Sequence, residues 1–433
     1  MNVRKFWLLS LVVLLVCQFG FAQVIANKTI AKQSFAKAQA TGKPTPLLAK
    51  PLPGTKARPV IWVTGQKWQK SIGPASKNVP GEPSFCDYNN GHQAAICPKG
   101  LQTAYGTNFP GANGGAGMTI VVLDYFSYPG AYAQLQFFDA VMHLPDPPSF
   151  KSIDLSGGND GTGTGWDLET MLDLEYSHAM APNASIVYIQ ADPNGDGSYE
   201  EQLAQSLGDV VSNSWTFTDQ NGVGVELPYW EANLGFGPPT LFAAGDGSAF
   251  PYEGPAYPCT SPQATCVGGT SLYLKPNLTR NIEEGWSGSG GGCSQVFAIP
   301  AWQGSVGSGV CAPYRAAPDI AAIADGNTPV AVWICNAYWG CYFYGVGGTS
   351  VATPVLSGLV ADMDTARVSF GKGKLNHLMN YELYPAAAYN YNYYYYDVIY
   401  GYNGYNAHPQ YDLITGIGVP TGKALASRFF GIP

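Results

Sequence analysis

Strand-like and helix-like runs alternate along the middle of the chain, and this alternation limits the possible folds more than any other feature. Apolar runs of strand length cover residues 118–124, 185–190, 210–215 and 240–244. Helix-like runs lie between them, at 131–144, 166–180, 198–207 and 225–234. Repeated βαβ units set parallel strands side by side, and their helices cover both faces of the sheet. We therefore predict an α/β fold of three layers with a mostly parallel central sheet.

The N-terminus has the pattern of an export signal. Arg4 and Lys5 precede an apolar run over 6–17, and a small-x-small cleavage site ends at Ala22. The run is shorter than the ~20 residues that span a bilayer. We interpret 1–22 as a cleaved signal peptide rather than a membrane anchor. We expect a secreted or periplasmic protein with no stable membrane insertion after cleavage.

Eight cysteines remain once Cys17 leaves with the signal peptide. An even number in an exported chain indicates disulfides. Sequence leaves many connectivities open, and we favour bridges between near neighbours: Cys86–Cys97, Cys259–Cys266, Cys293–Cys311 and Cys335–Cys341. A zinc site is the competing interpretation, but the chain has no C-x-x-C pair to support it.

Charge divides the chain near residue 80. Residues 23–80 hold ten Lys or Arg and no Asp or Glu, whereas residues 81–433 hold ten basic and thirty acidic side chains. Proline is frequent in the basic part, which favours extended backbone. We expect a basic, Pro-rich leader or vestigial pro-segment over 23–85 and one domain over 86–433. The acidic domain repels phosphates, so we expect no nucleic-acid partner.

A serine stands at the start of an apolar helix in the string Gly-Gly-Thr-Ser350-Val-Ala-Thr-Pro354. Free N–H groups and the helix dipole favour negative charge there, which suits a nucleophilic oxygen. A helix-capping serine is the ordinary alternative. We predict that the helix continues to about Met363.

Two acids share one face of the helix predicted over 166–180. Glu169 and Asp173 are four residues apart, a spacing at which acids are usually solvated and repel each other. A nucleophilic serine needs a base, however, and a carboxylate is one candidate. The chain has only five histidines, none in the H-G-T-H setting of a subtilisin-type base: His92, His143, His178, His377 and His408.

A further acid, Asp246, follows the strand predicted over 240–244 in the string Ala-Ala-Gly-Asp246-Gly-Ser. The carboxyl end of a parallel strand is where such folds place their sites. An acid in an ordinary Asp-Gly turn is the alternative.

These strings together resemble the sedolisin (serine-carboxyl peptidase) family over about residues 86–433. The resemblance rests on G-T-S-x-A-x-P around Ser350, E-x-x-L-D from Glu169 to Asp173, and A-G-D-x-G around Asp246. It implies a subtilisin-like fold in which Ser350 is the nucleophile, Glu169 replaces His as the base and Asp173 supports that base. A protonated Asp246 would donate to the oxyanion.

The same resemblance implies a supporting network in which Asp124 and Trp215 extend the hydrogen-bond chain of the base. Asp124 stands where the family usually has Glu. The family also carries a long folded prodomain, and in this chain only residues 23–80 precede the domain.

The C-terminal part resembles the calcium site of the family. Asp397 and Asp412 would supply carboxylates, and backbone carbonyls would come from Val398, His408 and Gln410, a donor set that suits a hard cation. The family usually has Gly at the last two of these positions. The alternative is a Tyr-rich surface segment without metal, and we expect residues 389–405 to form an ordered loop.

We therefore predict an acid-acting serine endopeptidase that hydrolyses polypeptides through Ser350, Glu169 and Asp173, binds one Ca²⁺ and is monomeric. A tripeptidyl exopeptidase of the same family is one alternative. A catalytically inactive binding or scaffold protein is another, which the presence of all four catalytic residue types disfavours.

Overall fold

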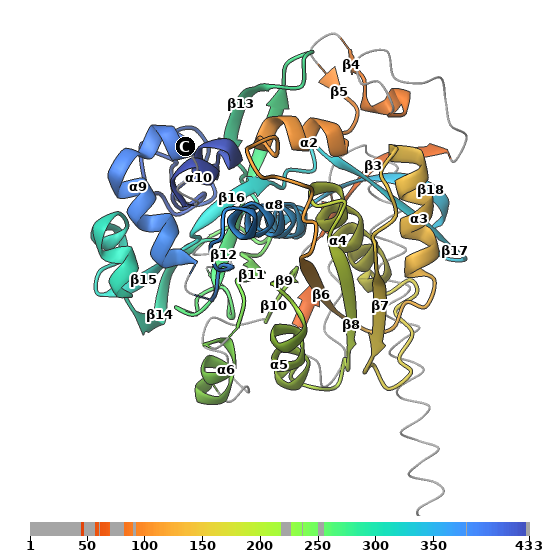
Figure 1. The fold of residues 1–433 in the computed structure, drawn as a ribbon, viewed down its shortest axis with the longest axis horizontal. Coiled ribbons are helices and arrows are strands. Elements are labelled where there is room, and N and C mark those ends of the chain that lie inside the picture. Colours follow the sequence, from red (N-terminus) through yellow and green to blue (C-terminus); the bar gives the residue numbers. More distant parts are fainter. Residues whose placement is uncertain are drawn as a thin grey trace, which may run out of the picture.

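The computed structural model describes residues 45–46, 57–59, 61–69, 82–89, 92–217, 227–235, 237–249, 255–377 and 379–429 (Figure 1). The predicted signal peptide over 1–22 lies outside the described residues, and so does most of the predicted leader.

An eight-stranded sheet forms the centre of the molecule, in the order β13-β12-β11-β9-β6-β8-β7, with β16 also pairing with β12. Its strands are β6 (Thr119–Tyr125), β7 (Phe150–Asp154), β8 (Ser185–Ala191), β9 (Val210–Asn213), β11 (Thr240–Ala243), β12 (Thr265–Leu274), β13 (Arg280–Gly285) and β16 (Ile320–Ile323). Every pairing is parallel except that of β12 with β13. The predicted parallel sheet is confirmed, and its carboxyl ends face one edge, where α/β folds build sites.

Helices cover both faces of this sheet (Figure 1). The helices of eight or more residues in the described part of the chain are α2 (Pro98–Tyr105), α3 (Ala131–Met142), α4 (Trp166–Met180), α5 (Ser198–Leu207), α6 (Leu227–Leu234), α8 (Thr349–Ser369), α9 (Asn380–Tyr394) and α10 (Gly422–Phe429).

Alternating side chains of β6 show the two faces. Ile120 and Val122 belong to the core that contains residues of α4 and α8, whereas Val121 and Leu123 belong to the core that contains residues of α5 and α6. Side chains of a strand point alternately to either face, so a continuous apolar run is what a doubly covered strand requires. The three-layer prediction is confirmed.

Two predicted boundaries differ from the structure. The run 210–215 divides into β9 and β10 (Trp215–Phe217), and Ser214 lies between them. The predicted loop over 389–405 was wrong in its first part, because α9 continues to Tyr394. Leu383 and Ala387 are buried one helical turn apart, the helix kinks at Asn390, and Tyr394 is buried beyond the kink, so buried side chains hold the Tyr-rich segment against the core.

Part of the segment predicted as a leader forms strands against the domain. β3 (Trp62–Gln69) pairs with β18 (Gly340–Gly347) in the sheet β1-β3-β18-β17, where β1 is Thr45–Pro46 and β17 is Val330–Asn336. β2 (Ala57–Pro59) pairs with β10. Ile61 and Val63 are buried, so this stretch contributes to the core.

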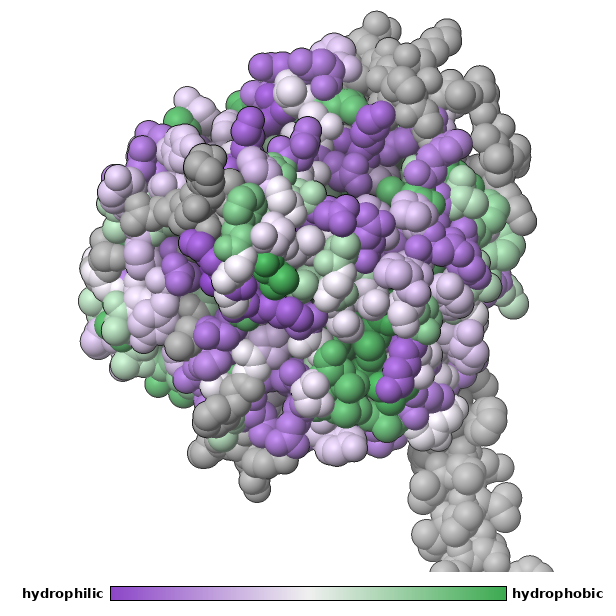
Figure 2. Space-filling model, in the orientation of Figure 1, coloured by the Kyte–Doolittle hydropathy of each residue, from purple (hydrophilic) through white to green (hydrophobic). Residues whose placement is uncertain are grey.

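The four predicted disulfides are confirmed: Cys86–Cys97, Cys259–Cys266, Cys293–Cys311 and Cys335–Cys341. No helix among the described residues has the length and apolarity that crossing a membrane demands. Figure 2 shows a face on which hydrophilic residues dominate, with one larger apolar group low in the view near β8 and α5.

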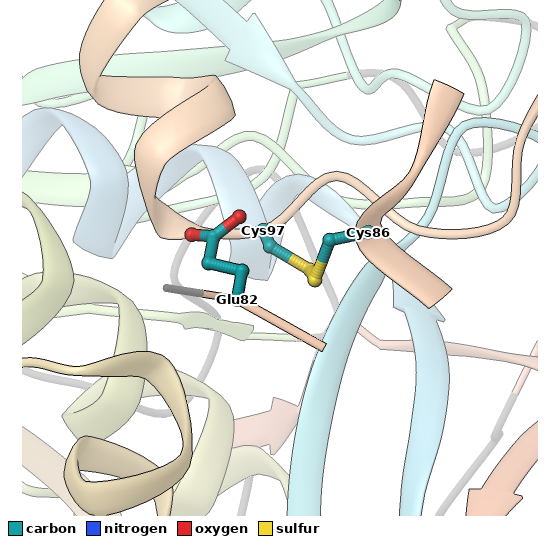
Figure 3. A group of neighbouring side chains, drawn as sticks. All are labelled: Glu82, Cys86 and Cys97. Atoms are coloured by element: carbon teal, nitrogen blue, oxygen red, sulfur yellow. A yellow bond between two sulfur atoms is a disulfide. The ribbon is translucent and has the colours of Figure 1, made fainter. Parts of the chain in front are cut away.

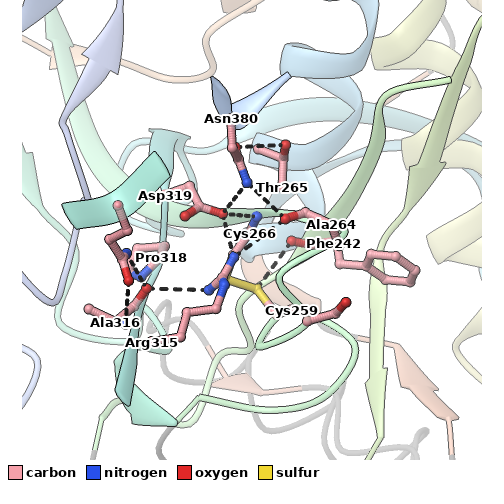
Figure 4. A network of polar contacts seen from close by, with 12 residues as sticks. Phe242, Cys259, Ala264, Thr265, Cys266, Arg315, Ala316, Pro318, Asp319 and Asn380 are labelled. Carbon is pink, nitrogen blue, oxygen red and sulfur yellow. Dashed lines mark hydrogen bonds and ion pairs between the residues drawn. A yellow bond between two sulfur atoms is a disulfide. The ribbon is translucent and has the colours of Figure 1, made fainter. Parts of the chain in front are cut away.

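A buried ion pair ties the C-terminal helices to the sheet (Figure 4). Arg315 Nη2 donates to Asp319 Oδ2 over 2.7 Å, and both side chains are fully buried. Asp319 also accepts from the hydroxyl of Tyr384 in α9, and Asn380 Nδ2 donates to the carbonyl of Ala264. Because the charges have several partners, the network orients β16 and α9 without leaving an isolated buried charge.

Candidate active site

Ser350 lies in the first turn of α8, directly after a glycine turn. Gly348 has φ 121°, a conformation that L side chains rarely adopt, and this lets the chain turn sharply from β18 into the helix. Pro354 has no N–H to donate to the carbonyl of Ser350, four residues earlier. That carbonyl instead accepts from Ser214 Oγ at 3.3 Å, and Ser350 Oγ donates to the Ser214 carbonyl at 3.1 Å.

The predicted base and its support lie next to the serine. Glu169 and Asp173 project from α4, which packs against α8, and both are completely buried. Burial first, and then the charge of Asp124, raises the pKa of Glu169 well above its ordinary value, while the nearby Ser350 hydroxyl acts in the opposite direction. Burial, then the charges of Asp124 and Glu169, raises the pKa of Asp173, and the nearby Ser214 hydroxyl lowers it. The carboxyl oxygens of Glu169 and Asp173 have no hydrogen-bond partner among the described residues, and the two serine hydroxyls donate to backbone carbonyls instead.

Asp124 completes a group of three buried carboxyls. It is the penultimate residue of β6, on the face covered by α4, and burial raises its pKa to about 7, which the nearby Thr170 hydroxyl opposes. Like charges in a buried site resist ionising together, so ionisation of Asp124 raises the pKa of Glu169 and of Asp173. Such a group accommodates one negative charge more easily than two.

Asp246 approaches the serine from the end of β11. Its Oδ1 accepts from the backbone N–H of Thr349 at 2.8 Å and from the Thr349 hydroxyl at 3.0 Å. Gly245 N–H in turn donates to the Thr349 hydroxyl at 3.1 Å. Asp246 is therefore fixed beside Ser350, and its charge raises the pKa of Glu169.

One expected link differs in the structure. The indole N–H of Trp215 donates to the backbone carbonyl of Leu123 at 3.0 Å, not to the carboxyl of Asp124. The ring of Trp215 lies in the core beneath the opposite face of the sheet, with Val121 and Leu123, whereas Asp124 faces α4. Trp215 thus holds the end of β6 in place rather than extending the carboxyl chain.

Two functional neighbours escaped the sequence prediction. Ser214 exchanges hydrogen bonds with Ser350 and also contacts Asp173, and Thr349 anchors Asp246. Both flank residues that the motifs single out, Trp215 and Ser350, and that adjacency is the only signal the sequence offers.

The predicted calcium ligands lie together near the C-terminus. Both carboxyl oxygens of Asp397 accept from Gln410 N–H, at 3.0 and 3.1 Å. Asp412 is fully buried and accepts from Thr415 N–H at 2.8 Å and from His408 N–H at 3.4 Å. Burial raises the pKa of Asp412 to about 6. Burial also raises the pKa of Asp397, and the nearby His408 acts in the opposite direction on both acids.

This donor set fits a hard cation. The backbone N–H groups of Gln410 and His408 hold the carboxyls of Asp397 and Asp412 against the same segment, oxygen donors are what a hard cation prefers, and a buried acid gains from a nearby positive ion. A different set of metal-type side chains, Glu82, Cys86 and Cys97, also clusters among the described residues. Figure 3 shows why it cannot bind as thiolates: the two sulfurs are joined in a disulfide.

Comparisons with known proteins agree with this geometry. A family model described as the subtilase family matches residues 155–383. Kumamolisin from Bacillus sp. (strain MN-32) is 27% identical over an alignment of 368 residues, which covers 75% of this chain and 62% of kumamolisin. Tripeptidyl-peptidase 1 from Rattus norvegicus is 31% identical over an alignment of 313 residues, which covers 62% of this chain and 52% of that protein.

Among solved structures, Pseudomonas sedolisin, a serine-carboxyl proteinase complexed with two molecules of pseudo-iodotyrostatin, superposes with a TM-score of 0.65. The match covers 78% of this chain and 98% of that chain at 22% identity, which bears on the fold alone. The chain belongs to the subtilase family, and kumamolisin and sedolisin are among the relatives that it resembles in sequence. It spans 62% and 52% of the lengths of the first two relatives named above.

Proposed function

We propose that this protein is an acid-acting serine endopeptidase whose general base is a carboxylate. The observation that carries the proposal is the position of the fully buried Glu169 on α4 beside Ser350 on α8, within a group of three buried acids. The one histidine on α4, His178, contacts the carbonyl of Pro145 at 2.7 Å instead of the serine. A histidine-based triad therefore has no support on this helix.

In the proposed reaction, Ser350 Oγ attacks the scissile carbonyl carbon while Glu169 accepts the hydroxyl proton. Loss of one proton from the three-carboxyl group leaves Glu169 as the base. Asp173 and Asp124 stay protonated and orient it. Glu169 then returns the proton to the leaving amine, and water repeats the sequence to release the acyl group.

Asp246 has the opposite requirement from Glu169. The carbonyl oxygen becomes an oxyanion when Ser350 attacks, and only a protonated Asp246 donates a hydrogen bond to it. Its fixed position against Thr349 supports this role. Activity needs an ionised Glu169 and a protonated Asp246 at the same time, which gives a bell-shaped pH profile with an optimum below neutral.

A calcium ion is part of the proposal, held by Asp397 and Asp412 with carbonyls of Val398, His408 and Gln410. Bound there, it would neutralise two acids and stabilise the C-terminal segment. Tyr411 connects that segment to the rest of the domain, because its hydroxyl donates to the Pro318 carbonyl beside β16.

We also propose that the basic segment covers the active site before activation. β2 pairs antiparallel with β10, so residues 57 to 59 run from Phe217 toward Trp215 and Ser214. The chain then continues so that Trp62 pairs with Gly347, three residues before Ser350. An extended polypeptide beside the nucleophile is the arrangement a substrate needs. The four disulfides support action outside the cytoplasm.

The test is digestion of an unfolded protein such as casein across a range of pH. We expect hydrolysis with an acidic optimum, and none with Ser350→Ala, a variant that should still fold. Equal hydrolysis by that variant would refute the proposal. Relatives that bear the name tripeptidyl-peptidase 1 make exopeptidase action the second candidate. Release of tripeptides only from a defined peptide would select it.

A further inference from the structure

The loop between β8 and α5 carries a motif that the proposed function does not use. Residues 192–201 read Asp-Pro-Asn-Gly-Asp-Gly-Ser-Tyr-Glu-Glu. Oxygen side chains at the first, third and fifth positions, followed by glycine at the sixth, form the first half of an EF-hand calcium loop. The glutamate that usually stands at the twelfth position is replaced by Leu203, and Glu200 stands at the ninth.

The backbone of the loop makes the turn that this motif requires. Gly197 has φ 73°, the left-handed conformation, and α5 starts at the next residue. Asp192 Oδ1 accepts from Asn194 N–H at 2.9 Å, and Asp196 Oδ1 accepts from Ser198 N–H at 3.0 Å. The backbone N–H of Asp192 reaches Glu200 Oε1 at 3.4 Å, so both ends of the loop meet.

A second observation points to something bound inside the loop. The hydroxyl of Tyr125, at the end of β6, is only 1% exposed, yet its oxygen has no hydrogen-bond partner among the described residues. It points at the loop, because a methyl group built on Gly197 would collide with it. A buried hydroxyl without a hydrogen-bond partner destabilises the folded state. A water or ligand in the loop would supply the partner.

The charges around this hydroxyl are all negative. Burial comes first among the causes that raise the pKa of Tyr125, followed by the carboxylates of Glu200, Asp196, Glu201 and Asp192. None of these four acids forms an ion pair with a Lys, Arg or His in the part of the chain that the structure describes. Among the described residues, these acids therefore have no counterion, although they surround the buried hydroxyl of Tyr125.

We propose that the 192–200 loop binds a divalent cation, with calcium the best fit. Asp192, Asn194, Asp196 and Glu200 supply oxygen ligands, and a water on the ion meets the hydroxyl of Tyr125. This site is separate from the proposed one at Asp397 and Asp412.

Binding has to draw the loop inward. Among the described residues, the carboxyl oxygens of Asp192, Asp196 and Glu200 do not yet lie within a common coordination distance. An open loop lacking the twelfth-position glutamate should bind weakly, with a Kd on the order of 10⁻⁴–10⁻³ M, as in extracellular calcium modules.

The site lies next to the catalytic residues. Tyr125 follows Asp124 directly, and its ring packs against Trp166 and Trp215 with centroid separations of 5.2 and 5.4 Å. An ion in the loop would therefore fix the end of β6 from the side opposite α4.

Calcium binding should be measured by equilibrium dialysis and by terbium luminescence excited through Tyr125 and Trp166. The protein is the full chain with Ser350→Ala, which removes self-digestion from the result. The variant is Asp196→Asn with Glu200→Gln, and the matched control is Asp160→Asn, which changes an exposed acid in another loop.

The double variant should lose one bound ion per chain, or bind it at least tenfold more weakly, while the control keeps it. Asp196→Asn alone, at an exposed position, should show the same direction and guards against misfolding of the double variant. Equal stoichiometry and affinity in all proteins would overturn the proposal, as would binding lost only on changing Asp412.

Discussion

Replacing Asp124 by Asn should remove a large part of the pH dependence of stability. Burial raises the pKa of this carboxyl from 3.8 to about 7. The unfolded chain therefore releases the proton at lower pH than the folded chain does. Stability contributed by the protonated acid is present below about pH 4 and is lost as pH rises toward 7.

The magnitude follows from these two pKa values. The raised pKa of Asp124 lowers the free energy of unfolding by about 1 kcal/mol at about pH 4.5 and by about 4 kcal/mol at about pH 7.5. Asn cannot ionise, so the variant avoids both penalties. Any fixed cost of the amide is the same at both pH values and cancels when the two measurements are subtracted.

The assay is urea unfolding of Ser350→Ala protein, with and without Asp124→Asn, at these two pH values. The variant should gain about 3 kcal/mol relative to its parent on going from the lower to the higher pH. Asp160→Asn, an exposed acid, should show no such gain. If the free energy of unfolding depended equally on pH in the parent and in Asp124→Asn, the raised pKa of the buried Asp124 carboxyl would be refuted.

Three further outcomes are expected. Asp246→Ala should lower turnover by ~10²–10³ at the pH optimum without unfolding, measured as kcat on a peptide substrate; near-normal turnover, or a wild-type optimum above neutral, would exclude a protonated donor. Chelation should lower the melting temperature and calcium should restore it; at a hundredfold excess over Kd the site at Asp397 and Asp412 adds about 2.7 kcal/mol to the free energy of unfolding, and Asp412→Asn should remove that part of the response. Deleting residues 24–59 should speed the first appearance of activity on secretion, and unchanged secretion and activity would count against a covering role for β2.

Local patterns predicted much of the fold. The strand and helix of Thr119–Tyr125 and Trp166–Met180 are nearly as predicted, because a doubly covered strand and a buried helix leave continuous apolar signals. α9 escaped prediction since its buried positions are mostly Tyr and Ala, which hide the helical period. Pairings between distant segments, such as β2 with β10, leave no local signal at all.

The candidate site was likewise predictable only in part. Ser350, Glu169 and Asp173 are found from strings that lie within single elements, whereas their contact depends on how α4 packs against α8. The direction of the Trp215 indole, toward Leu123 rather than Asp124, follows from which face of the sheet each residue occupies. Ser214 separates β9 from β10, so residue types and their spacing do not predict which face of the sheet Trp215 occupies.

The most direct test compares two glutamates of the same helix. Glu169 and Glu175 are both fully buried on α4, but Glu175 accepts from the N–H of Trp333 at 3.0 Å, away from the serine. The measurement is kcat for peptide hydrolysis at the pH optimum. Glu169→Gln should lose at least ~10²-fold, the scale of general-base catalysis, while Glu175→Gln stays within severalfold of the parent. Comparable activity in Glu169→Gln and Glu175→Gln would contradict a carboxylate base.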